Sequence, residues 1–176
     1  MTSFFVSTVL YLTYFFMFVN TRNISSSALF ANPCVIIKVR RENMVTYKTT
    51  VKMHDTDAAR VLFFGHQFKM IHDAYELFLE RIGFPFAKIL RHTNFFVPVV
   101  HAESDYKAPL FVGDRLSINV TLAGIGTTSF AITYTIKNQN QKIVGTAKTV
   151  HVSVHAKTHK KIPLPPAFRK ALTKAR

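Results

Sequence analysis

Two periods of hydrophobic and polar residues run along this chain, and the change from one to the other marks its elements. Between residues 46 and 53 apolar and polar side chains alternate, which is the period of a β-strand. From residue 64 to residue 81 the apolar positions recur every three or four residues, which predicts one long amphipathic helix. This helix should end before Gly83 and Pro85, and one of its faces must be buried.

The second half of the chain returns to the strand period. Apolar and β-branched residues bounded by turn signals predict four further strands, at residues 95–108, 116–122, 130–137 and 143–155. A short basic helix is expected at residues 165–173. Since the strands follow one another through short turns, these elements predict an α+β domain in which the helix packs on an antiparallel five-stranded sheet.

The N-terminal segment differs from the rest of the chain. Residues 4–19 form an uncharged apolar run, which is short for a membrane span of about 20 residues. No Lys or Arg precedes this run, whereas a secretory signal begins with basic residues. We therefore divide the chain into an extension at residues 1–43 and a folded domain at residues 44–176. The extension is either a targeting or membrane segment or a spurious start before Met44.

The charge of the chain is strongly positive and unevenly placed. The formal net charge is +14, and all nine acidic residues lie between Glu42 and Asp114. A basic C-terminal part suits a polyanionic partner. Binding of single-stranded nucleic acid favours aromatic residues among the charges, but the basic tail after Lys157 holds only Phe168, so no nucleic-acid partner is expected. The single cysteine, Cys34, excludes an internal disulfide.

Candidate chemistry lies where the first strand meets the helix. Asp55 and Asp57 stand a few residues before the predicted helix start. A helix N-terminus has unpaired backbone N–H groups that stabilise negative charge on a carbonyl oxygen. A carboxylate beside such a terminus can attack a carbonyl or activate water, although a single Asp at this place is also a common helix cap. The arrangement is typical of a hydrolase.

The segment from His54 to His66 resembles the hotdog-fold enzymes of the 4-hydroxybenzoyl-CoA thioesterase type, in which a strand, an Asp-x-Asp turn and a central helix follow one another. Residues 97–109, 113–116 and 163–165 are also similar to that family, and most similar to its 1,4-dihydroxy-2-naphthoyl-CoA thioesterase branch. The resemblance covers about residues 46–170. It implies a hotdog fold, with the sheet wrapped around the helix, and a homodimer or homotetramer with active sites between subunits.

The same resemblance implies roles for individual residues. Asp57 falls on the catalytic position of the family, as nucleophile or as general base, and Asp55 on a position that shapes the turn. The backbone N–H groups of Phe64 and Gly65 are expected to bind the oxyanion. Both catalytic mechanisms require an ionised Asp57, so the sequence does not separate them.

Three positions depart from the usual pattern of the family. Arg60 replaces a common Gly, so it either strains the turn or acts as a cation beside Asp57. His66 stands where Asn or Gln is more usual, and Phe64 where related bacterial enzymes have His. Arg60 and His66, together with Asp55 in the turn, are candidate auxiliary residues.

Binding residues are suggested by position. Three phenylalanines near the predicted turn and second strand are candidates for an aromatic acyl pocket: Phe63, Phe95 and Phe96. Three lysines after the last strand are candidates for the phosphates of coenzyme A: Lys157, Lys160 and Lys161. The histidines show no metal-ligand spacing followed by a carboxylate, so neither a metal nor a cofactor is expected.

The predicted function is hydrolysis of an aromatic acyl-CoA, and the resemblance implies 1,4-dihydroxy-2-naphthoyl-CoA as the substrate, in menaquinone or phylloquinone biosynthesis. One alternative is a broad thioesterase for fatty or short-chain acyl-CoA or acyl-carrier-protein esters. A second is a hotdog module that binds acyl-CoA or nucleic acid without turnover. A cytoplasmic location is expected, with membrane contact only if the N-terminal apolar segment is genuine.

Overall fold

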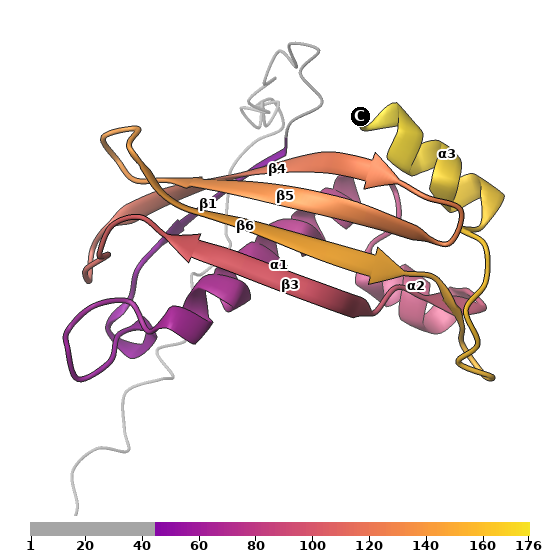
Figure 1. The fold of residues 1–176 in the computed structure, drawn as a ribbon, viewed down its shortest axis with the longest axis horizontal. Coiled ribbons are helices and arrows are strands. Elements are labelled where there is room, and N and C mark those ends of the chain that lie inside the picture. Colours follow the sequence, from indigo (N-terminus) through magenta and orange to yellow (C-terminus); the bar gives the residue numbers. More distant parts are fainter. Residues whose placement is uncertain (1–44) are drawn as a thin grey trace, which may run out of the picture. The chain divides into compact units, whose positions relative to one another are not determined.

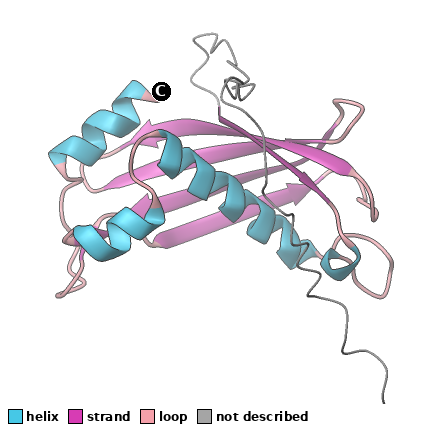
Figure 2. Cartoon of the chain, turned by 180° about the vertical axis from the view of Figure 1, so that it is seen from behind, coloured by secondary structure: helices cyan, strands magenta, loops and turns pink. Residues whose placement is uncertain are grey.

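The computed structural model describes residues 45–176, which form one antiparallel sheet with a long helix across one face (Figures 1 and 2). The sheet has the strand order β1-β4-β5-β6-β3. Its strands are β1 (Val45–Thr50), β3 (Val99–Tyr106), β4 (Arg115–Ile125), β5 (Ser129–Lys137) and β6 (Ile143–Val152). The predicted α+β class and five-stranded sheet are confirmed. The extension at residues 1–43 lies outside the described residues.

The long helix α1 (Phe64–Arg81) has the bounds that its apolar period predicts. Its buried face packs on the sheet through Met70, Ile71, Ala74, Tyr75, Phe78 and Leu79. The strands alternate to match, and β5 turns Phe130, Ile132, Tyr134 and Ile136 into the same core. Each fully buried Ile, Leu or Phe side chain contributes roughly 1.5–3 kcal/mol of transfer free energy. This packing fixes where the start of α1 lies relative to the sheet.

Two of the predicted strands are each broken into a long and a short piece. The expected strand 95–108 consists of β2 (Phe95–Phe96) and β3, and the expected strand 143–155 consists of β6 and β7 (Val154–His155). Pro98 lies in the first break, where a residue without an N–H cannot continue a ladder of hydrogen bonds. The short pieces β2 and β7 pair with each other, outside the main sheet.

The remaining helices are short. A 3₁₀ turn, η1 (Met53–Asp55), follows β1, and α3 (Pro166–Lys174) forms near the predicted position. Helix α2 (Phe86–His92) stands where the sequence predicts a loop. The prediction is wrong because seven residues are too few to display a helical period. Within residues 45–176, no helix has the length and apolar character needed to cross a membrane.

A buried polar side chain of α1 reaches the edge strand β3. The edge strand β3 is exposed along nearly its whole length, and only Ser104 on it is partly buried. The buried Gln67 side chain of α1 reaches this strand, where its Nε2 donates to Ser104 Oγ at 2.6 Å. Gly145 on β6 leaves room for that amide, since an added Cβ would lie 2.9 Å from Gln67 Oε1 and 3.1 Å from Asp105 O.

Substitution of Gly145 by Ala should therefore destabilise the protein. A methyl group forced against the Gln67 amide and the β3 backbone costs about 1–3 kcal/mol, as overpacking does elsewhere. Gly124→Ala is the matched control, because a Cβ there meets nothing within 4 Å, and its effect should stay within about 0.5 kcal/mol. Chemical denaturation of both variants measures the difference. Equal free energies of unfolding would show that the close approach is not a constraint.

Candidate active site

A tight turn between β1 and α1 carries the two aspartates. Its arms are joined by an antiparallel bridge between Thr56 and Leu62, and by a hydrogen bond from Asp57 N to Val61 O at 3.0 Å. Arg60 N donates to Asp57 O at 2.9 Å and closes the tip. The turn thus presents residues 57–60 to solvent at the end of the sheet where α1 begins.

Asp57 is exposed, and only one of its two carboxylate oxygens accepts a hydrogen bond within residues 45–176. Its Oδ1 accepts the N–H of Ala59 at 2.8 Å, which fixes the direction of the side chain. No hydrogen bond to Oδ2 is present within residues 45–176. One carboxylate oxygen is therefore held while the other is free for chemistry.

The first turn of α1 supplies the expected hydrogen-bond donors. Phe63 is the N-cap and makes no side-chain cap, and no acidic residue lies in the first turn. The backbone N–H groups of Phe64 and Gly65 have no acceptor within the described part of the chain. A Cβ on Gly65 would lie 2.8 Å from the ring of Phe63, so glycine allows this ring to fold over the helix start. The two N–H groups and the helix dipole can stabilise an oxyanion.

Asp55, in contrast, is buried in the base of the turn, with 3% of its surface exposed. Its Oδ2 accepts the N–H of Lys52 at 2.9 Å, and its backbone carbonyl accepts the N–H of Phe63 at 2.9 Å. Burial by itself raises the pKa of this carboxyl. The Lys52 N–H and the positive charges of His54, Lys69 and His66 outweigh burial, so the pKa lies below its usual value.

His66 contacts the same residue through its ring. Its Nδ1 lies 3.0 Å from the backbone oxygen of Asp55, and because a carbonyl only accepts, Nδ1 is the protonated nitrogen in this contact. The neutral form of the ring then has its lone pair on Nε2. The ring also packs edge-on against Phe63, with centroids 5.4 Å apart.

Arg60 adopts a left-handed backbone conformation with φ of 64°. This is the conformation that the usual Gly at this position would adopt without strain. Among residues 45–176, Arg60 forms no ion pair with Asp57. The consequence of the substitution that can be seen is therefore backbone strain at the tip of the turn.

The structure does not bring the other predicted site residues to this turn within one chain. The hydroxyl of Tyr106, at the end of β3, donates to Phe64 O at 2.9 Å. This end of β3 therefore lies beside the start of α1. Phe95 and Phe96 precede the opposite end, and eight strand residues span roughly 25 Å. Phe95 is moreover only 6% exposed, and its ring packs against Phe168 with centroids 5.3 Å apart.

The predicted phosphate-binding lysines lie at that distant end too. They follow β7, which pairs with β2, and all three are exposed: Lys157, Lys160 and Lys161. Phe63, by contrast, lies beside the turn and is 38% exposed. The candidate residues thus form two groups, one at each end of β3.

Two residues near the turn were not identified from the sequence as site residues. Lys69 approaches Asp55, and Tyr106 bonds the first turn of α1. Lys69 follows His66 by three positions and so shares its helix face, which was the available signal. Within the described residues, no group of three His, Cys, Asp or Glu side chains is placed to hold a metal ion.

A sheet packed on one long helix, with an exposed carboxylate turn at the helix N-terminus, is the architecture of the hotdog-fold thioesterases. The chain belongs to the thioesterase-like superfamily, whose family model matches residues 51–172. It is 36% identical over 122 residues to a 1,4-dihydroxy-2-naphthoyl-CoA hydrolase from Crocosphaera subtropica, covering 68% of this chain and 89% of the relative.

Solved structures of thioesterases are also similar to this chain. A 1,4-dihydroxy-2-naphthoyl-CoA thioesterase from Synechocystis is 33% identical, with a TM-score of 0.69, over 74% of this chain and 96% of that one. A gentisyl-coenzyme A thioesterase is 26% identical, with a TM-score of 0.66, over 72% of this chain and 98% of that one. The predicted resemblance to hotdog thioesterases and to the naphthoyl-CoA branch is confirmed.

Replacing Arg60 by Gly should stabilise the turn. A left-handed conformation costs roughly 1–2 kcal/mol for a residue with a Cβ, and Gly removes that cost while losing some backbone entropy. Arg60→Ala is the control, since it removes the same charge and keeps the strain. We expect a higher thermal unfolding midpoint for the Gly variant than for the Ala variant. Equal midpoints would mean that the turn is not strained at this position.

Proposed function

We propose that the protein hydrolyses an aromatic acyl-CoA thioester, with 1,4-dihydroxy-2-naphthoyl-CoA as the substrate, and releases the free acid and coenzyme A. The observation that carries the proposal is that Oδ2 of Asp57 is free in the turn that leads into α1, whose first backbone N–H groups, those of Phe64 and Gly65, are unpaired within residues 45–176. The substrate is inferred from the relatives, which are named for it. The proposal includes its place in quinone biosynthesis and a cytoplasmic location.

In this mechanism the thioester carbonyl oxygen binds the N–H groups of Phe64 and Gly65. Asp57 either attacks the carbonyl carbon directly, forming an anhydride, or removes a proton from the attacking water. In both routes the C–S bond breaks and coenzyme A leaves as a thiolate, which takes its proton from the water consumed. That water supplies the oxygen of the new carboxylate, either by attacking the thioester or by hydrolysing the anhydride, which frees Asp57. The negative charge on the carbonyl oxygen develops at the positive end of α1, where the helix stabilises it.

We further propose that two chains complete each site. Within residues 45–176 the outer edge of β3 pairs with no strand, and β3 exposes Val99, Val100 and Tyr106. An exposed edge of this kind pairs readily with a second copy. Antiparallel pairing of β3 with β3 places the start of one strand beside the end of the other. The partner's Phe96 and the partner's Lys157 would then come to the Asp57 turn, uniting the two groups of candidate residues.

This assembly also refines the proposed pocket. Phe63 and the partner's Phe96 remain available to an aromatic acyl group. The ring of Phe95 is buried against Phe168 and is not available to it. Pairing of dimers into a tetramer is compatible with the same sites. Membrane contact depends on residues 4–19, which lie outside the described residues.

Asp57→Asn should abolish turnover while the fold remains intact. Loss of a general base costs ~10²–10⁴-fold in rate, and loss of a nucleophile usually more. Asp55→Asn should be milder, because Asp55 faces the base of the turn and not the exposed tip. Steady-state assays of purified protein against aroyl-CoA, fatty acyl-CoA and acyl-carrier-protein esters test both the residue and the substrate.

The outcomes of that assay separate the alternatives. A preference for fatty or short-chain esters would support the broad thioesterase. Binding of acyl-CoA without turnover by the wild type would support the binding module. Near-normal turnover by Asp57→Asn together with loss in Asp55→Asn would move the catalytic assignment by two residues.

Replacement of Lys157, Lys160 and Lys161 by Gln should raise KM with kcat little changed, since the phosphates bind equally in ground and transition states. We expect roughly a tenfold rise, because each of the three exposed charge pairs contributes about 0.5 kcal/mol and together they approach the 1.4 kcal/mol of a tenfold change. High salt should weaken the effect, and an acyl-pantetheine substrate without the nucleotide should show none. An equal defect with acyl-pantetheine would point to damage elsewhere.

Mixed dimers test whether the site is shared. A chain with Asp57→Asn combined with a chain lacking the three lysines should regain activity at the normal KM, because one of the two sites then has Asp57 from one chain and the lysines from the other. If each site lay within one chain, mixing would restore nothing. A monodisperse monomer in light scattering at micromolar concentration would also contradict the shared site.

A further inference from the structure

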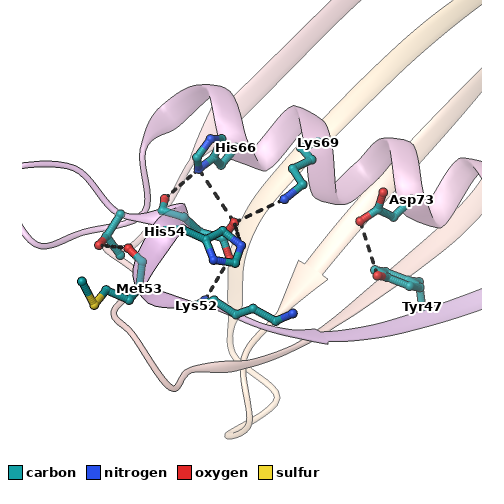
Figure 3. Close-up of polar contacts among 9 residues, drawn as sticks. Tyr47, Lys52, Met53, His54, His66, Lys69 and Asp73 are labelled. Atoms are coloured by element: carbon teal, nitrogen blue, oxygen red, sulfur yellow. Dashed lines mark hydrogen bonds and ion pairs between the residues drawn. The ribbon is translucent and has the colours of Figure 1, made fainter. Parts of the chain in front are cut away.

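One face of α1 forms a polar seam with the segment before it. His66, Lys69 and Asp73 lie three and four residues apart on the helix and so project from the same side (Figure 3). Each contacts the segment 47–55: His66 and Lys69 approach Asp55, and Asp73 Oδ2 accepts the hydroxyl of Tyr47 at 3.4 Å. Strand β1 and the base of the turn are therefore held on the helix by polar contacts.

Asp55 is the central acceptor of this seam. Its side chain is 5% exposed, and its Oδ1 faces Lys69 Nζ at 3.6 Å, with His54 Nε2 at 3.6 Å and His66 Nδ1 at 3.9 Å. A buried carboxylate without a counter-charge is strongly unfavourable. An ammonium group remains charged through the neutral range, whereas an imidazole exchanges its proton there. Lys69 is thus the permanent counter-charge of Asp55.

We propose that Lys69 is a positioning residue for the hydrolysis: by pairing with Asp55, it holds the turn that carries Asp57 against the first turn of α1. This inference rests on the proposed function. The connection is short, since the backbone oxygen of Asp55 accepts the N–H of Phe63, the residue that precedes the oxyanion donors. Asp57 lies two residues further along the same turn.

The charge state of Asp55 gives the pair a pH dependence. Burial raises the pKa of Asp55, but the Lys52 N–H and the charges of His54, Lys69 and His66 lower it by more than burial raises it. The pKa of Asp55 is therefore below its usual value. A carboxyl with a lowered pKa stabilises the fold at and above its ordinary pKa, and this stability is lost as the pH falls through the lowered value. Removing Lys69 raises the pKa of Asp55, so the loss should begin at a higher pH.

The test is a cycle of variants: Lys69→Met, Lys69→Arg, Asp55→Asn and the double variant Asp55→Asn with Lys69→Met. Two quantities are followed against pH, kcat/KM with an aroyl-CoA and the thermal unfolding midpoint. Lys69→Met should lower kcat/KM at neutral pH on the order of tenfold, as a misplaced turn would, and move the acid limb of both curves to higher pH. Lys69→Arg should restore both curves.

Two comparisons separate positioning from general effects. In the Asp55→Asn background, Lys69→Met should produce no further change in either curve, because its partner no longer carries charge. Lys48→Met is the matched control, since Lys48 is exposed on β1 and is not among the groups that act on Asp55, so both curves should stay as in the wild type.

The proposal is overturned if Lys69→Met acts equally with and without the Asp55 carboxylate, or if Lys48→Met moves the acid limb as far. Unchanged kinetics in Lys69→Met with a shifted unfolding curve would also overturn it, because the pair would then stabilise the fold without positioning the turn. If the wild type hydrolyses no acyl-CoA, the proposed function fails, and the unfolding curves still decide whether Lys69 holds Asp55.

Discussion

The buried carboxylate of Asp55 is the constraint on which the geometry of the site depends. A carboxylate with 5% of its side chain exposed requires donors and counter-charge, and here Lys52 and His54 supply them from the segment that follows β1, and Lys69 and His66 from α1. Because these contacts join that segment and the helix to one residue, the turn has little freedom to slide along the helix. The position of Asp57 relative to the N–H groups of Phe64 and Gly65 follows from this anchoring.

The sheet imposes a second constraint on the site. Gln67 and the close approach at Gly145 fix α1 against β6 and β3, so the helix start lies at the Tyr106 end of the edge strand. The proposed pocket and phosphate residues lie at the other end. In the proposed assembly the site in one chain is half of a site, and the exposed edge of β3 offers the contact through which a second chain would supply the remainder.

The departures from the usual family pattern affect the turn in different ways. Arg60 keeps the left-handed conformation that Gly would adopt, so the backbone path is preserved at the expense of strain. His66 retains a hydrogen bond to the turn through Nδ1. Phe64 contributes only its backbone to the proposed chemistry. The turn geometry is thus compatible with these side chains, and Oδ2 of Asp57, the proposed catalytic carboxylate, accepts no hydrogen bond within residues 45–176.

Local patterns in the sequence predicted the long helix, the five-stranded sheet and the family. The three-to-four-residue period defined α1 from Phe64 to Arg81, and the Asp-x-Asp turn before it identified the hotdog thioesterases, because both signals are local. The breaks in the strands near Pro98 and Ser153 and the roles of Lys69 and Tyr106 were decided only by tertiary structure. So was the separation of Phe63 from Phe95. These depend on which residues distant in sequence meet across the sheet and helix, and a periodic pattern records the face of a residue but not its neighbour.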